Sequence, residues 1–204
     1  MNDAQPSDLP IATALAEETF SPPGSPRSYT LAPMTYRERT AFRADLAREG
    51  GLYPTTEQFF AVLRTAIATA APDNQAQLLA VLNAAEADPK GEDKAAQAAL
   101  AVLEVSLSAD PGYAALMAAR RRWNGMMPFC AARFALRGWS GPGLPAFRRE
   151  KGIVPDELMD HIPEAEIEPV GNRALALLRP SKAAEGNSAP LSPSPGSQTP
   201  SPEG

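Results

Sequence analysis

Apolar residues recur at helical spacing through the middle of the chain. In the stretch 55–71 they follow the spacing i, i+4, i+7, i+8 and i+11, which predicts one buried helix face. Leucines and alanines repeat in a similar way over 73–87 and 92–108, which predicts two further helices. No hairpin pattern stands out. The predicted fold class is therefore all-α, a compact multi-helix bundle.

Capping signals indicate where the first helices begin and end. Thr35 and Glu38 have the spacing of a capping box, in which each side chain accepts a hydrogen bond from a free backbone amide. Gly50 and Gly51 allow the positive φ angle that commonly ends a helix. These signals predict a first helix over 35–50 and a second that opens at Thr55 or Thr56.

A fifth helix is predicted from the pair Asp110 and Pro111, an N-cap followed by proline at the first helical position. Further along, Gly125 and Pro128 predict an interruption, because a proline inside a helix removes a hydrogen bond and clashes with the preceding turn. A sixth helical segment over 128–138 is expected after this break.

Composition divides the chain into four parts. The helical core domain is predicted for 29–138. Over 139–179, turn residues alternate with apolar anchors, which predicts an irregular segment with short helices that pack on the core. Proline is frequent at both ends, so 1–28 is predicted to be flexible. The Pro/Ser-rich tail 180–204 carries too few apolar residues to offset its ordering entropy and is predicted to be disordered.

The overall charge and the lack of targeting signals favour a cytoplasmic protein. The net charge of −5 gives the whole chain no general attraction for nucleic acid or anionic membranes. A single cysteine excludes an internal disulfide and suits a reducing compartment. The N-terminus lacks the pattern of a signal peptide, and no stretch is long and apolar enough to predict a membrane span.

Candidate catalytic residues are few. His161 lies among carboxylates but has no nucleophile nearby in the sequence, and Cys130 stands in a run of helix-packing residues. One histidine and one cysteine are too few for a typical zinc site, and no phosphate-binding motif is present. The chain is therefore predicted to be no enzyme, with no catalytic residues, metal or cofactor.

Basic residues cluster between 120 and 151, where eight of them stand against a single acid. The following stretch 152–170 holds six acids and no Lys or Arg. Three interpretations remain open: internal pairing between the two blocks, a protein-docking surface, or contact with the phosphates of nucleic acid. Nucleic acid is the least favoured, because three consecutive arginines at 120–122 spread around a helix and form no single face.

Arginines also mark the first predicted helix. Arg37, Arg39 and Arg43 fall outside the expected packing positions Tyr36, Phe42 and Leu46, so they are predicted to face outward. Arginine suits bidentate and stacked contacts better than lysine does. These three residues are therefore candidates for a docking edge, and plain solubility is the alternative.

Two stretches together resemble tail assembly chaperones of long-tailed, siphovirus-type bacteriophages and prophages. "YTLAPMTYRERTAFRADLAREGG" is similar to the extended lead-in and first helix of that family. "LRGWSGPGLPAFRREKGIVPDELMDHIP" resembles its stretch after the core helices: a Gly-Trp pair, a Gly/Pro turn, an apolar pair and a short helical segment. The resemblance covers roughly residues 29–178.

The resemblance implies a non-enzymatic role. Such chaperones bind the tape-measure protein, keep it soluble in the host bacterial cytoplasm and help to recruit tail-tube subunits, and they are not expected in the mature virion. Self-association and a longer frameshifted product are also compatible with this family. Within this interpretation, Arg37, Arg39 and Arg43 form the docking edge, and Trp139 and Phe147 anchor the C-terminal segment. The alternative is a small helical DNA-associated or regulatory protein that uses the basic region 120–151.

Overall fold

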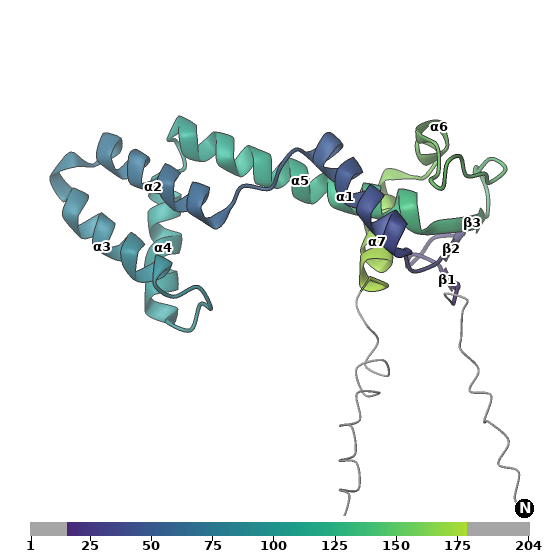
Figure 1. Ribbon diagram of the computed structural model, residues 1–204, viewed down its shortest axis with the longest axis horizontal. Helices are drawn as coiled ribbons and strands as arrows, with labels where there is room; N and C mark the ends of the chain where they lie inside the picture. The colour runs from purple at the N-terminus through teal and green to yellow at the C-terminus, as the bar shows by residue number, and fades with distance from the viewer. Residues whose placement is uncertain (1–15, 179–204) are drawn as a thin grey trace, which may run out of the picture.

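The computed structural model describes residues 16–178, which are mostly helical (Figure 1). The elements, in chain order, are β1 (Glu18–Phe20), β2 (Ser28–Leu31), α1 (Tyr36–Gly50), α2 (Thr56–Ala70), a 3-10 turn (Pro72–Asn74), α3 (Gln75–Glu86), α4 (Lys94–Ser106), α5 (Pro111–Ala135), β3 (Leu136–Ser140), α6 (Asp156–Met159) and α7 (Glu164–Ala176). No helix of this part of the chain is long and apolar enough to cross a membrane. The disorder predicted for 180–204, and the flexibility predicted for 1–15, concern residues outside the described range.

Two hydrophobic cores lie along the 25-residue helix α5. The first core is enclosed by α2, α3, α4 and the first half of α5, which we call the helical lobe. The second is enclosed by the sheet, α1, α6, α7 and the second half of α5, which we call the mixed lobe. Figure 1 shows the two lobes toward opposite ends of α5. The apolar residues predicted for one compact bundle are thus divided between two cores.

A three-stranded antiparallel sheet is the main departure from the predicted all-α fold. β2 lies in the centre, with Tyr29 opposite Phe20 on β1 and opposite Trp139 on β3. β1 falls within the stretch 1–28 that was predicted to be flexible. Strands of three to five residues show too little alternation to be recognised. The protein is therefore mainly helical but not strictly all-α.

The helix α5 runs without a break through Gly125 and Pro128, so the predicted interruption there is wrong. Proline at 128 removes only the hydrogen bond to the carbonyl of Asn124, and Asn124 is exposed, so that water can replace the lost donor. Pro128 itself is buried in the mixed lobe. Packing on both sides of the proline therefore keeps the helix continuous.

The crossing of α5 and α7 is unusually close. Gly171 of α7 lies directly against the backbone of Pro128, and a Cβ atom added to Gly171 would lie 2.5 Å from the Cα of Pro128 and would overlap its carbonyl group. α7 begins at Glu164, and the sequence predicted short helices within an irregular segment here. Pro163 occupies the N-cap position, and Pro169 lies inside the helix.

A buried carboxylate connects the sheet to α7. Glu166 is 8% exposed and accepts hydrogen bonds from the hydroxyls of Tyr29 (2.5 Å) and Ser25 (2.7 Å) and from the guanidinium of Arg27 (2.9 Å). Burial alone would raise the pKa of Glu166, but these hydrogen bonds outweigh it and hold the pKa below its usual range. The ionised carboxylate therefore contributes to the stability of the mixed lobe.

The depressed pKa of Glu166 predicts acid sensitivity. Because the folded-state pKa lies below the unfolded value, the unfolded state binds more protons in acid, and stability is lost as the pH falls from about 4.3 through the folded pKa. Glu166→Gln should lower the free energy of unfolding at neutral pH by about 1–3 kcal/mol and flatten its decline in acid. Urea unfolding at a series of pH values measures both effects. Glu168→Gln, at an exposed position, is the control, and equal acid slopes for wild type and Glu166→Gln would contradict the assignment.

Candidate functional site

The helix α1 carries three exposed arginines. Thr35 caps the helix and forms the predicted capping box with Glu38, while Phe42 and Leu46 are buried in the mixed lobe. This packing leaves the side chains of Arg37, Arg39 and Arg43 exposed, as the sequence predicted. None of the three forms an ion pair with any other residue of the range 16–178. We call these three residues the arginine face; Arg39 and Arg43 are one turn apart on the same side of α1, and Arg37 lies on a different side of the helix.

A groove of about 310 Å³ adjoins the arginine face. It is lined by Tyr36, Arg39, Thr40, Phe42, Arg43 and Leu178. Tyr36 was predicted to pack in the core, but it is 80% exposed at the first position of α1, so that prediction is wrong. The arginine face therefore combines positive charge with an exposed aromatic ring, two properties that are common at protein interfaces.

The predicted anchors Trp139 and Phe147 contact each other. Their rings meet edge to face with centroids 4.9 Å apart, and the indole of Trp139 donates a hydrogen bond to the carbonyl of Pro145 at 2.8 Å. Both side chains are partly buried against the mixed-lobe core. They hold the segment that follows β3 against the lobe, and each keeps a part of its surface exposed.

Internal contacts occupy much of the basic region 120–151. Arg133 bridges Asp45 (3.2 Å) on α1 and Asp156 (3.0 Å) on α6, and its side chain is 8% exposed. Arg148 pairs with Glu157 at 2.6 Å. These two arginines show the predicted pairing between the basic and acidic blocks.

Two other arginines of the basic region pair elsewhere. Arg137 and Arg149 both reach Glu38 at the start of α1, at 3.1 and 2.9 Å. Burial alone would raise the pKa of Glu38, but its hydrogen bonds with the Thr35 backbone and Arg149 and the charge of Arg137 hold it below the usual range. These pairs join the segment after β3 to the first turn of α1, next to the arginine face.

The arginine triplet at 120–122 is divided among different surroundings. The guanidinium of Arg120 stacks over Phe59, 4.5 Å from the ring centroid, and also lies over Tyr53. Arg122 donates a hydrogen bond to the backbone carbonyl of Glu49. The triplet therefore links the two lobes through local contacts, and its members point in different directions, as expected from helical geometry.

The side chains of Cys130 and His161 lie in different environments. Cys130 is fully buried in the mixed lobe, and burial together with the nearby carboxylate of Asp45 raises the pKa of its thiol to about 12, which disfavours the reactive thiolate. His161 is exposed at the end of α6. Within residues 16–178, no group of three or more His, Cys, Asp or Glu side chains is arranged to hold a metal ion.

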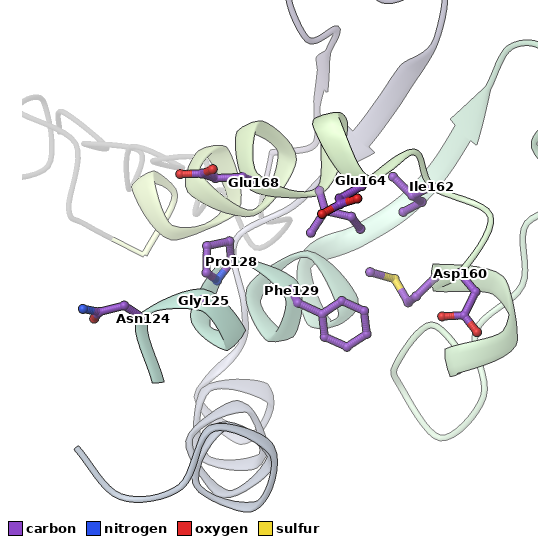
Figure 2. Close-up of a pocket in the computed structure, with 10 residues that line it drawn as sticks. Asn124, Gly125, Pro128, Phe129, Asp160, Ile162, Glu164 and Glu168 are labelled. Atoms are coloured by element: carbon purple, nitrogen blue, oxygen red, sulfur yellow. The ribbon is translucent and has the colours of Figure 1, made fainter. Parts of the chain in front are cut away.

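A pocket of about 720 Å³ lies between α5, the end of α6 and α7 (Figure 2). We call it the acidic pocket. Its apolar lining comes from Pro128, Phe129, Met159, Ile162 and Ile167. Figure 2 shows Asp160 and Glu168 toward opposite sides of the view, with Pro128 and Phe129 of α5 between them.

No protein-family model, curated protein or solved structure matches this chain. The interpretation of the candidate sites therefore depends on the contacts, burial and charges described above.

The acidic pocket was not predicted from the sequence. Its lining residues come from α5 and from a segment about thirty residues further along, which the sequence predicted to be irregular. The available signal was the excess of acids over 152–170, which was interpreted as the internal partner of the basic region. Asp156, Glu157 and Glu166 do pair internally, but Asp160, Glu164 and Glu168 line the pocket instead.

Proposed function

We propose that this chain is a tail assembly chaperone of a long-tailed bacteriophage or prophage. In this role it binds the tape-measure protein in the host cytoplasm, keeps it soluble and helps to recruit tail-tube subunits, without enzymatic activity and without remaining in the mature virion. The family is suggested by the two sequence stretches at 29–51 and 136–163. The structural observation that supports a docking role is the arginine face of α1.

The arginine face has the properties of a polar docking edge. Its three guanidinium groups are exposed and form no ion pair with other described residues, in contrast to the four paired arginines of the basic region. An exposed Tyr36 and a groove lie beside two of them, those of Arg39 and Arg43. Exposed arginines and tyrosines of this kind are typical hot-spot residues when a partner covers them. Each guanidinium offers several donors to partner carboxylates.

The same comparison argues against the DNA-associated alternative. Binding to a phosphate backbone requires several basic side chains that are free on one surface. Arg133, Arg137, Arg148 and Arg149 are held in ion pairs with Asp or Glu of the chain. We therefore place the docking function on α1 and not on the region 120–151.

Charge reversal on α1 tests this proposal. The triple variant Arg37→Glu/Arg39→Glu/Arg43→Glu should weaken binding of the tape-measure protein by about tenfold or more, because it replaces guanidinium donors by repelling carboxylates. The measurement is a pull-down from cells that co-express the full chain with the tape-measure protein of the same phage or prophage, followed by titration of the purified partners. Circular dichroism checks that the variant remains folded.

A matched control separates this local effect from the change in net charge. Lys90→Glu/Arg121→Glu/Lys151→Glu reverses three exposed basic residues outside α1 and changes the net charge equally. We expect this control to bind as the wild type does. If both triple variants bind the tape-measure protein as tightly as the wild type does, the arginine face serves solubility and not docking. Failure of the wild type to bind, with binding to DNA that weakens steeply with salt, would instead support the DNA-associated alternative.

A further inference from the structure

We propose that the acidic pocket binds an amphipathic helix of a partner protein, one that carries Lys or Arg beside its apolar face. This second docking surface lies on α5, α6 and α7, away from the arginine face of α1, and has the opposite charge. The inference does not depend on the chaperone proposal. It is based on the shape of the pocket, its apolar lining and its unpaired carboxylates.

The apolar part of the pocket suits side chains from a helix. Phe129 on α5, Met159 and Ile162 near α6, and Ile167 on α7 line one continuous space of about 720 Å³. That volume is within the usual range of binding pockets and accommodates two or three aliphatic side chains. Met159 and Ile162 are buried and form the floor of the pocket, so Phe129 and Ile167, which are partly exposed, supply most of its accessible apolar surface. The pocket is thus suited to apolar anchors spaced one helical turn apart.

The charged rim selects for a basic partner. Asp160, Glu164 and Glu168 line the pocket and are exposed, and none forms an ion pair within the described residues. Glu164 and Glu168 are one turn apart on α7, where like charges repel each other. Among residues 16–178, no Lys or Arg lines the pocket. A cationic side chain at the rim would relieve this repulsion and fix the orientation of the bound helix.

The surroundings favour a helix as the occupant over an extended strand. The lining residues belong to helices and to the short connection between α6 and α7, so the pocket offers no sheet edge for strand addition. A second copy of the chain fits less well. The basic face of α1 exposes one large apolar side chain, Tyr36, because Phe42 and Leu46 are buried in its own core. The pocket needs several apolar anchors.

Gly125 provides a substitution that fills the pocket without disturbing the fold. It lies on α5 in the pocket lining, and a Cβ atom added there meets no atom within 4 Å. Gly125→Leu therefore places a branched side chain at the pocket and also improves helix propensity. Gly125→Ala gives most of the same helical benefit but leaves the pocket open, so it is the matched control.

The test uses a synthetic helical peptide of about 18 residues, with Leu at i, i+3, i+4 and i+7 and Lys on both sides of the Leu stripe. Two control peptides carry Glu in place of Lys, or Ala in place of Leu. Fluorescence anisotropy with the full chain should show micromolar binding of the basic peptide and binding at least about tenfold weaker for each control peptide. Gly125→Leu should weaken binding of the basic peptide by about tenfold or more, and Gly125→Ala should leave this binding unchanged.

Rim variants test the charge requirement. Glu164→Lys/Glu168→Lys should weaken binding of the basic peptide by about tenfold. The control Glu57→Lys/Glu92→Lys makes the same change in net charge in the helical lobe and should have little effect on this binding. Three results would overturn the proposal: no binding of the basic peptide to the wild type, equal binding to Gly125→Leu, or equal binding of the Ala peptide. Sedimentation is expected to show no dimer of the wild type at the pocket. A wild-type dimer that Gly125→Leu dissociates would instead assign the pocket to a second copy of the chain.

Discussion

Gly171→Ala is expected to destabilise the mixed lobe by about 3 kcal/mol, because the new methyl group has no space at the crossing of α5 and α7. The neighbouring atoms are the backbone of Pro128, with its Cα 2.5 Å from the position of the added Cβ. Backbone within a packed helix cannot rotate away as a flexible side chain can. The two helices must therefore separate, which loosens the core around Val170 and Ala174.

Tryptophan fluorescence during urea unfolding measures this effect. Both tryptophans, Trp123 and Trp139, pack against the mixed-lobe core, so their emission reports the lobe that contains the crossing. Gly125→Ala is the control, since it adds the same methyl group to a helix at a position with open space. It should stabilise the protein by up to about 1 kcal/mol through helix propensity. A Gly171→Ala variant as stable as the wild type would show that the helices do not approach so closely.

Arg133→Met is expected to cost about 3–5 kcal/mol, because it leaves a buried carboxylate without its main partner. The guanidinium of Arg133 bonds Asp45 at 3.2 Å, Asp156 at 3.0 Å and the carbonyl of Val154 at 3.2 Å. Asp45 is 7% exposed, and among the ion pairs of residues 16–178 it would then keep the one with Arg48, whose side chain is 64% exposed. The variant therefore weakens the connection of α5 to both α1 and α6.

The double variant Asp45→Leu/Arg133→Met tests whether the unpaired charge causes the loss. It should recover much of the stability lost by Arg133→Met, because replacing both charges by apolar groups removes the uncompensated carboxylate. Arg48→Met should cost at most about 1 kcal/mol, since the Arg48 side chain is 64% exposed and Asp45 keeps its pair with Arg133. Tryptophan fluorescence in urea again provides the measurement. A double variant less stable than Arg133→Met would mean that the geometry of the hydrogen bonds matters more than the charge.

The local features of the fold could be predicted from the sequence. Thr35 with Glu38, and Thr55 with Gln58, form the capping boxes of α1 and α2, and Asp110 caps α5. Each signal depends on residues three positions apart, so a sequence pattern contains all the information that is needed. The helical period around Phe42 and Leu46 likewise predicts the exposure of Arg37. Arg39, seven positions before Leu46, shares the side of α1 on which Leu46 packs, so its exposure depends on tertiary packing.

The features that the sequence did not indicate depend on contacts between distant segments. β2 pairs with β3 across 112 residues at Ser28 and Ser140. α5 remains helical through Pro128 because α7 packs against it at Gly171. The acidic pocket has the same origin, since α5 supplies part of its apolar lining and α7 part of its rim. A pattern within one segment does not contain such information, and tertiary contacts override the local tendency of proline to end a helix.

The two docking surfaces give the mixed lobe a clear asymmetry. The arginine face and Tyr36 lie on α1, and the unpaired carboxylates Glu164 and Glu168 lie on α7. Internal ion pairs occupy other arginines of the lobe, including Arg133 and Arg137. The arginine face on α1 and the pocket carboxylates on α7 thus have opposite charge, which under the two proposals suits two different segments of partner protein.

The most direct test of the central claim is co-expression of the full chain with the tape-measure protein of the same phage or prophage, with the soluble fraction of the tape-measure protein as the quantity measured. We predict that this fraction rises several-fold when the chain is present and that the two proteins co-purify. A tape-measure protein that remains insoluble beside a folded, soluble chain would contradict the chaperone function.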